Sequence, residues 1–184
     1  TMNLIHRDVS PHNVMIGFTG EVKLFDFGIA RLVGDSDPIE GMPGGGKYAY
    51  MSPEQAAGRA MDHRSDVYSA GVVLYELLVG NPPFGSQLDC DDRTEGRILE
   101  GNVPFPHGVV SPLAKSFILK ALTYNWDERP TALELIRHPW ITKYCGDIQV
   151  LQPKAAAAAA GKGKQEPFRR LSSKNLDTLL WRVI

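Results

Sequence analysis

The segment HRDVSPHN at residues 6–13 brings several chemically active side chains together within eight positions. Asp8 and Asn13 stand on either side of a turn that Pro11 restricts, and Asp26 follows Asn13 after a largely apolar segment. If the chain folds back between them as a hairpin, Asp26 returns to the side of Asn13. A carboxylate and an amide oxygen that converge there can bind Mg²⁺, a hard cation that prefers oxygen ligands. Asp8 then lies nearby as a base, and transfer of a phosphoryl group to a hydroxyl needs this combination.

Short strands and a turn are expected to position these side chains. The segments NVMIGF (13–18) and EVKLFDF (21–27) are rich in apolar and β-branched residues, and the pair Thr19–Gly20 separates them as the turn of a hairpin does. The segment VGDSDPIEGMPGGGK (33–47) holds five glycines and two prolines, which predicts a long loop with a function. Its glycines at 44–46 indicate flexibility and not a phosphate cradle, because no strand leads into them.

Helices are expected to dominate the rest of the domain. Residues 66–80 are apolar on nearly all sides, which predicts a central, buried helix. Residues 94–101 and 111–122 are amphipathic, each with a Ser or Thr able to cap its start. Residues 131–140 predict a further helix, capped by Thr131 and closed by Pro139.

Composition narrows the class of protein. The 184 residues suit one domain of ordinary size, and 43% of them are hydrophobic. The net charge of −1, from 20 basic and 21 acidic residues, argues against a nucleic-acid-binding protein. Cys90 and Cys145 are far apart and predict inert thiols in a reducing compartment, which favours the cytoplasm. The most apolar run, at 70–80, contains Glu76 and is too short for a membrane segment.

Residues 146–184 differ in character from the rest. QPKAAAAAAGKGKQEPFRR is of low complexity and indicates a linker, followed by a basic tail. The end, NLDTLLWRVI, predicts a short amphipathic helix with leucines on one face. RRLSS at 169–173 places two arginines before Ser172 and Ser173, which is either a target of autophosphorylation or a basic patch on a solvated tail.

Several ordered motifs resemble the serine/threonine protein kinase family. HRDVSPHN fits the catalytic loop, in which H-R-D is followed by N, and DFG at 26–28 follows at the family's spacing. YMSPE at 50–54 is similar to the A-P-E element, with Ser52 in place of Ala. SDVYSAG, GNPPF and WDERPTA resemble later landmarks, so the resemblance covers about residues 3–142. The amino-acid sequences of HRDVSPHN and GKYAYMSPEQ are most similar to those of bacterial members.

The resemblance implies a fold and a reaction. The fold would be mainly α with a small β-hairpin region, as in the large lobe of a kinase, and residues 1–145 would form a partial kinase domain. ATP and Mg²⁺ would be the cofactors, and proteins with Ser or Thr hydroxyls would be the substrates. Asp8 would orient that hydroxyl and accept its proton, Asn13 and Asp26 would hold Mg²⁺, and Met15 would form part of the floor under adenine.

The resemblance also implies supporting roles. His6 and Phe27 would stack in the spine that links the two lobes, with Gly28 completing the DFG motif. Arg7 would meet a phosphate or a carboxylate from the activation segment, the stretch from DFG at 26–28 to the A-P-E element at 50–54. Asp66 would hold the catalytic loop by its backbone amides. Arg129 would form an ion pair with Glu54.

The chain lacks the motifs of the kinase small lobe. It contains no G-x-G-x-x-G-x-V loop and no V-A-I-K lysine. The expectation is therefore that these residues alone do not transfer phosphate and that a small-lobe segment upstream in cis completes the enzyme. The alternative is a truncated, noncatalytic kinase-like module for binding or regulation, and a scaffold that uses its terminal helix is a weaker third possibility.

Two departures from the family pattern concern the catalytic residues. Most members have Lys two positions after the catalytic Asp and Thr in a "GT" ahead of the A-P-E element, whereas this chain has Ser10 and Lys47 there. The hypothesis is an exchange: Lys47 brings the ammonium group to Asp8 from the opposite wall, and Ser10 supplies the hydroxyl. Alternatively, Lys47 is an exposed loop residue and the function is lost.

The activation segment has a single hydroxyl between Gly28 and Lys47, that of Ser36. It stands in the acidic setting GDSDPIE, so Asp35, Asp37 or Glu40 could meet Arg7 without phosphorylation. The alternative is that Ser36 is a plain loop serine.

Overall fold

The structure, a computed structural model, describes residues 4–32, 47–85 and 92–145. The predictions for Ser36, for the glycines at 44–46, for Cys90 and for residues 146–184 concern positions outside this part of the chain.

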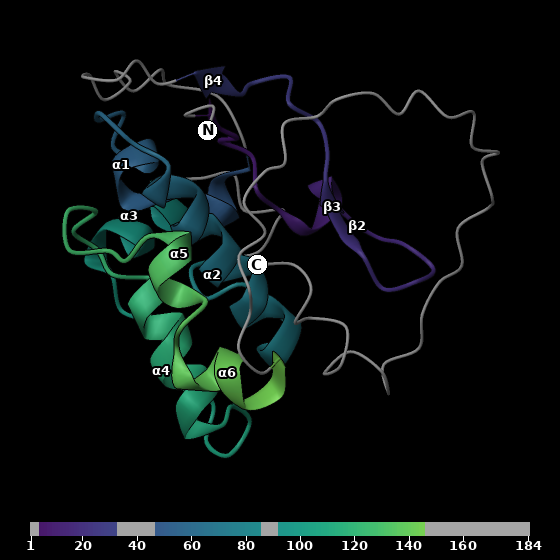
Figure 1. Cartoon of the computed structure of the whole chain (residues 1–184). Coiled ribbons are helices and arrows are strands. Elements are labelled where there is room, and N and C mark those ends of the chain that lie inside the picture. The colour runs from purple at the N-terminus through teal and green to yellow at the C-terminus, as the bar shows by residue number, and fades with distance from the viewer. Residues whose placement is uncertain (1–3, 33–46, 86–91, 146–184) are drawn as a thin grey trace, which may run out of the picture.

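The described residues form a mostly helical body with two small antiparallel sheets, which confirms the expected fold class (Figure 1). The strands are β1 (Leu4–Ile5), β2 (Val14–Ile16), β3 (Val22–Leu24) and β4 (Arg31–Leu32). The helices are α1 (Pro53–Ala56), α2 (Arg64–Val79), α3 (Asp92–Glu100), α4 (Pro112–Ala121), α5 (Ala132–Leu135) and α6 (Pro139–Cys145), with 3₁₀ turns η1 (Pro11–Asn13) and η2 (Tyr48–Tyr50).

The expected hairpin is present as β2 and β3. They pair antiparallel, with Val14 opposite Leu24 and Ile16 opposite Val22. In the turn between them, the amide of Gly17 donates to the carbonyl of Glu21 and the amide of Gly20 donates to the carbonyl of Gly17. Gly20 adopts a φ of 84° that suits glycine. Both strands are shorter than the sequence predicts, and β4 pairs with β1 in a second, unexpected sheet.

Helix α2 forms the centre of the core, and the other helices gather around it (Figure 1). Its closest neighbour is α4: a Cβ atom added to Gly71 would lie 2.8 Å from the Cβ of Ala121. The helix ends at Gly80, whose φ of 101° is left-handed and whose amide donates to the carbonyl of Glu76. The prediction that this helix is buried on nearly all sides is wrong for the last turn of α2. Leu77, in that turn, is 40% exposed and lines the apolar cavity beside the hairpin.

The capping predictions had mixed outcomes. Ser111 caps α4 by accepting a hydrogen bond from the amide of Ala114, as expected. Thr131 caps α5 in a reciprocal capping box with Glu134, also as expected. Thr94 does not cap α3, because that helix already begins at Asp92.

Pro139 also differs from the expectation. The sequence predicts one helix over 131–140 that closes at Pro139, but α5 ends at Leu135 and Pro139 begins α6. A proline is well suited to the first turn of a helix, where its missing N–H leaves no hydrogen bond unmade. Within the described residues, no helix has the length and the apolar character needed to cross a bilayer.

Candidate active site

The catalytic-loop segment is fastened to the central helix by Asp66. Its carboxylate accepts hydrogen bonds from the backbone amides of His6, at 2.7 Å, and Arg7, at 2.9 Å. These contacts are the ones that the sequence analysis expected. Arg7 adopts a φ of 70°, which is uncommon for a residue with a side chain, so the two hydrogen bonds help to hold a strained turn. Burial raises the pKa of the Asp66 carboxyl, against the lowering effect of these hydrogen bonds.

His6 joins the loop to the DFG motif. Its ring packs edge-on against Phe27, with 4.8 Å between the ring centroids. The amide of Asp8 lies 3.3 Å from Nδ1 of His6, and the carbonyl of Phe25 lies 3.0 Å from Nε2. Because Nδ1 faces a donor and Nε2 an acceptor, the ring proton is assigned to Nε2. The expected contact between His6 and Phe27 is present, but the rings meet edge-on and do not stack in parallel, and Phe27 remains 53% exposed.

Asn13 fixes the position of Asp8. Its Nδ2 donates to the carboxylate Oδ2 of Asp8 at 2.7 Å and to the backbone carbonyl of Asp8 at 2.8 Å. Both partners are acceptors, so the nitrogen of the amide must face Asp8. The amide oxygen of Asn13 is then the atom left for a cation.

Asp26 follows directly after the hairpin that begins at Asn13. The amide of Phe25 donates to the carbonyl of Asn13 at 3.0 Å, so the hairpin returns Asp26 beside the start of β2. Asp26 has a φ of 62°, and its Oδ1 accepts from the amide of Gly28 at 3.2 Å. A Cβ atom at Gly28 would lie 3.1 Å from the same oxygen, so a glycine keeps this carboxylate accessible.

Asn13 and Asp26 carry oxygen atoms of the kind that bind Mg²⁺. This ion is commonly bound by one or two protein oxygen ligands, with water and substrate phosphates completing its coordination. The described residues contain no group of three or more His, Cys, Asp or Glu side chains suited to a metal ion.

Lys47 lies at Asp8, as the exchange hypothesis expects. Its Nζ lies 3.1 Å from Oδ2 and 3.4 Å from Oδ1 of the Asp8 carboxylate. The bridging role expected for the Ser10 hydroxyl is not seen. Ser10 is fully buried, and its Oγ has no hydrogen-bond partner among the described residues. The lysine stem is long enough to reach the carboxylate directly, so no bridge is needed.

The roles expected for Arg7 and Met15 remain predictions. Arg7 is buried, and its guanidinium donates at 3.4 Å to the carbonyl of Ile29, while its Nε has no partner among the described residues. The acidic residues expected to meet it, at 35–40, lie outside the described residues. Met15 lies on β2 opposite Lys23 and is 36% exposed.

Glu54 and Arg129 form the expected ion pair. Two parallel hydrogen bonds, of 2.6 and 2.9 Å, join their side chains, and both residues are almost fully buried. Ser65 donates a further hydrogen bond of 2.6 Å to Glu54. Burial acts to raise the pKa of Glu54, but the hydrogen bonds and charge of Arg129 and the bond from Ser65 outweigh it, so the pKa lies below its ordinary value.

The sequence analysis missed Gln55. This buried side chain donates from Nε2 to the carbonyl of Arg7 at 3.0 Å, and so ties α1 to the catalytic loop. Its Oε1 also accepts from the amide of Ser52, which completes the capping box of α1. The available signal was Ser52 itself, because Ser followed three residues later by Gln is a capping-box pattern.

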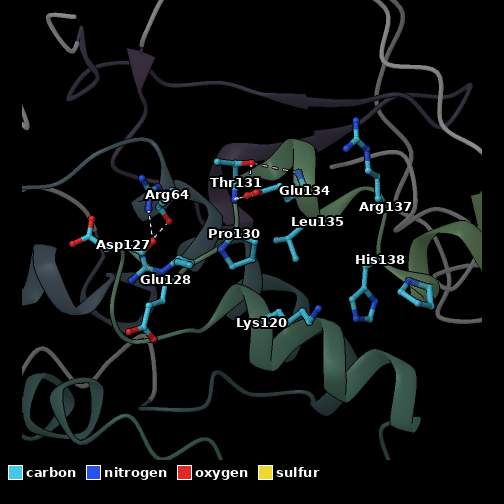
Figure 2. Close-up of a pocket in the computed structure, with 12 residues that line it drawn as sticks. Arg64, Lys120, Asp127, Glu128, Pro130, Thr131, Glu134, Leu135, Arg137 and His138 are labelled. Carbon is cyan, nitrogen blue, oxygen red and sulfur yellow. Dashed lines mark hydrogen bonds between the residues drawn. The ribbon is translucent and has the colours of Figure 1, made fainter. Parts of the chain in front are cut away.

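Two cavities are lined in part by residues of these contacts, Arg129 in one and Asp66 in the other. A polar cavity of 540 Å³ mixes basic and acidic side chains, and in Figure 2 Arg64 and Arg137 lie on opposite sides of it, so they do not converge on one point. An apolar cavity of 380 Å³ lies between the hairpin and α2. Near the end of α6, burial raises the pKa of the Cys145 thiol, which disfavours the reactive thiolate.

Comparison with known proteins agrees with the geometry. Residues 1–141 match the family model described as protein kinase domain. The chain belongs to the protein kinase family. The chain is 37% identical over 141 residues to an Aurora kinase of Eremothecium gossypii, covering 77% of this chain and 37% of that protein. It is 43% identical over 136 residues to the serine/threonine-protein kinase PknB of Mycobacterium leprae, covering 72% of this chain and 22% of that protein.

A third kinase relative is similar over a shorter stretch. A probable serine/threonine-protein kinase PknB of Bifidobacterium longum is 54% identical over 85 residues, which are 45% of this chain and 12% of that protein. The expected resemblance to serine/threonine kinases, with bacterial relatives among them, is confirmed. The chain spans well under half the length of these kinases.

Proposed function

We propose that these residues form the catalytic large lobe of a serine/threonine protein kinase. The oxygen of a protein Ser or Thr hydroxyl bonds to the γ-phosphorus of ATP, and the bond from that phosphorus to its bridging oxygen breaks, so that ADP leaves. Asp8 orients the hydroxyl and receives its proton. The reaction depends mostly on positioning and on charge stabilisation, because the protein forms no covalent intermediate.

The observation that carries the proposal is the double hydrogen bond from Asn13 to Asp8. It gives the Asn13 amide two tasks at once: its nitrogen fixes the base, and its oxygen is left to bind a cation. Asp26, returned by the hairpin, supplies the second oxygen ligand. A base and a cation site set side by side in this way support phosphoryl transfer more than a simple binding module.

Residues 1–184 alone are proposed to transfer phosphate poorly. They contain neither a glycine-rich loop nor the lysine that contacts the α- and β-phosphates in this family. A small-lobe segment in cis is the proposed partner that supplies both. Radiolabel transfer by this chain and by the product of the complete reading frame, measured side by side, tests the point.

Catalysis is tested in the product of the complete reading frame with labelled ATP, Mg²⁺ and basic Ser/Thr protein substrates. Asp8→Asn and Asp26→Asn are expected to abolish transfer, because they remove the base and a metal ligand. Asp127→Asn is the matched control, since this exposed residue lies away from the loop and its carboxylate is not part of the proposed site. If the unaltered protein binds ATP but transfers no phosphate, the noncatalytic module is the correct alternative.

A further inference from the structure

The contact between Lys47 and Asp8 joins residues 39 positions apart. The side chain of Lys47 is 36% exposed and that of Asp8 is 15% exposed, so the ammonium group covers the base while remaining open to a substrate. Exposed ion pairs contribute little to stability, so folding alone gives a weak reason for placing a lysine here.

The backbone of Lys47 is held by the core. Lys47 is the N-cap residue directly before η2, and its carbonyl accepts a hydrogen bond of 2.9 Å from the amide of Tyr50. Tyr50 is buried, and its hydroxyl donates to Glu76 on α2 at 2.6 Å. The ammonium group therefore projects toward Asp8 from an anchored turn, in contrast to a residue in a freely exposed loop.

Ser10 occupies the position from which the family pattern would bring a lysine to the same carboxylate. It is fully buried, and its short side chain makes no hydrogen bond to the described residues, so it carries no charge to Asp8. Among the described residues, the salt bridge to Asp8 comes from Lys47. One cation is thus present at the base, but it arrives from the activation segment and not from the catalytic loop.

We propose that Lys47 is the cation that neutralises the charge developing on the transferring phosphoryl group and positions Asp8, in place of a lysine at position 10. This inference rests on the proposed kinase function and adds to it a residue outside the catalytic loop. A donor already aimed at the reacting group stabilises the transition state more than the bound substrate, so its loss lowers kcat more than it raises KM. The exchange also makes the base dependent on the placement of the activation segment.

The first test is Lys47→Met in the product of the complete reading frame. Methionine keeps most of the apolar stem and removes the charge. The expected result is a fall in kcat on the order of 10²-fold. The dissociation constant for ADP, measured by calorimetry, should stay within about threefold of the original value, because ADP lacks the transferred group. Lys143→Met is the control, since that exposed lysine lies on α6, and it should leave both values unchanged.

The second test exchanges the two residue types back. Lys47→Thr alone should lose activity as Lys47→Met does, and Ser10→Lys together with Lys47→Thr should recover much of it. A lysine with a merely structural role at position 47 would not be replaced from position 10. Because Ser10 is buried, circular dichroism and thermal melting must show that the double variant folds, and if it does not, the Lys47→Met kinetics decide.

The outcomes separate the inference from the proposed function. An active protein whose Lys47→Met variant keeps its kcat overturns the inference and leaves the kinase function standing. A folded double variant no better than Lys47→Thr overturns the exchange as well. If the unaltered protein transfers no phosphate to any Ser/Thr substrate, the proposed function fails and the inference fails with it.

Discussion

Glu54 and Arg129 are 75 residues apart and meet in a bidentate ion pair inside the core. Arg129 also donates to the backbone carbonyls of Thr123, Arg64 and Tyr124, so its guanidinium is well supplied with acceptors. The pair therefore joins the helix after the activation segment to the loop before α5. A buried pair of this kind is costly to break, because either partner alone is left as an unpaired buried charge.

Arg129→Met is expected to lower the free energy of unfolding by about 3–5 kcal/mol, because it leaves the Glu54 carboxylate unpaired. Urea unfolding followed by circular dichroism measures the change. Arg137→Met is the control, since this side chain is exposed, and it should change the stability by no more than about 0.5 kcal/mol. A loss of under about 1 kcal/mol in Arg129→Met would contradict the tight pairing.

The same pair predicts a sensitivity to acid. The pKa of Glu54 is lower in the folded protein than its ordinary value of 4.5, so folding favours the ionised form. The stability from this carboxylate is fully present above pH 4.5 and is lost as the pH falls through the folded pKa. Glu54→Gln should therefore make the decline of unfolding free energy on acidification shallower, as measured by urea titrations at several pH values.

The pKa of Asp66 shifts in the opposite direction from that of Glu54, so its effect on stability must be separated in that experiment. Burial raises the pKa of Asp66 above its ordinary value of 3.8. The contribution of Asp66 to stability therefore falls as the pH rises from 3.8 through the folded pKa. Only the difference in slope between the unaltered protein and Glu54→Gln isolates Glu54. Equal slopes in the two proteins would show that the pKa of Glu54 is not lowered by folding.

Much of the site could be predicted from spacing. The hairpin between Asn13 and Asp26 was visible as two apolar segments around a turn, and the contact between Lys47 and Asp8 was expected from two departures that matched each other. Both depend on local pattern or on motifs with a fixed order. The motifs themselves indicate the family, because their number and order make a chance match improbable.

The rest of the fold could not be predicted because it depends on tertiary placement. Strands β1 and β4 have two residues each, too few for a periodic signal. The hydrogen bond from Gln55 to the Arg7 carbonyl joins segments 48 residues apart, and nothing in either segment indicates the other. Helix α3 begins two residues before Thr94, because a hydroxyl residue able to cap a helix can also lie within its first turn.

Asp66→Asn is expected to loosen the catalytic loop. An amide has one oxygen, so it cannot accept both amide hydrogens of His6 and Arg7 in the present geometry, and its NH₂ group would face a donor. Leaving a buried donor unsatisfied costs about 1–3 kcal/mol. The measurements are the unfolding free energy and amide hydrogen exchange at residues 6–8, which should become faster. Unchanged exchange there would show that Asp66 does not hold the loop.

Gly71 provides a test of the core that is independent of the site. A Cβ atom at this position would lie 2.8 Å from the Cβ of Ala121 and 3.1 Å from Cδ2 of Leu122, so Gly71→Ala should force α2 and α4 apart. Overpacking of this kind costs about 1–3 kcal/mol, which exceeds the helix-propensity gain of about 1 kcal/mol from alanine. A melting temperature lowered in Gly71→Ala is the expected result.

Gly96 is the matched control for that substitution. It lies within α3, and a Cβ atom there meets nothing within 4 Å. Gly96→Ala should therefore gain the helix propensity without the clash and raise the unfolding free energy by about 0.5–1 kcal/mol. The two changes have the same chemistry and opposite expected signs, so a general effect of alanine cannot produce both. If Gly71→Ala also stabilises the protein, α2 and α4 do not approach each other as closely as the structure places them.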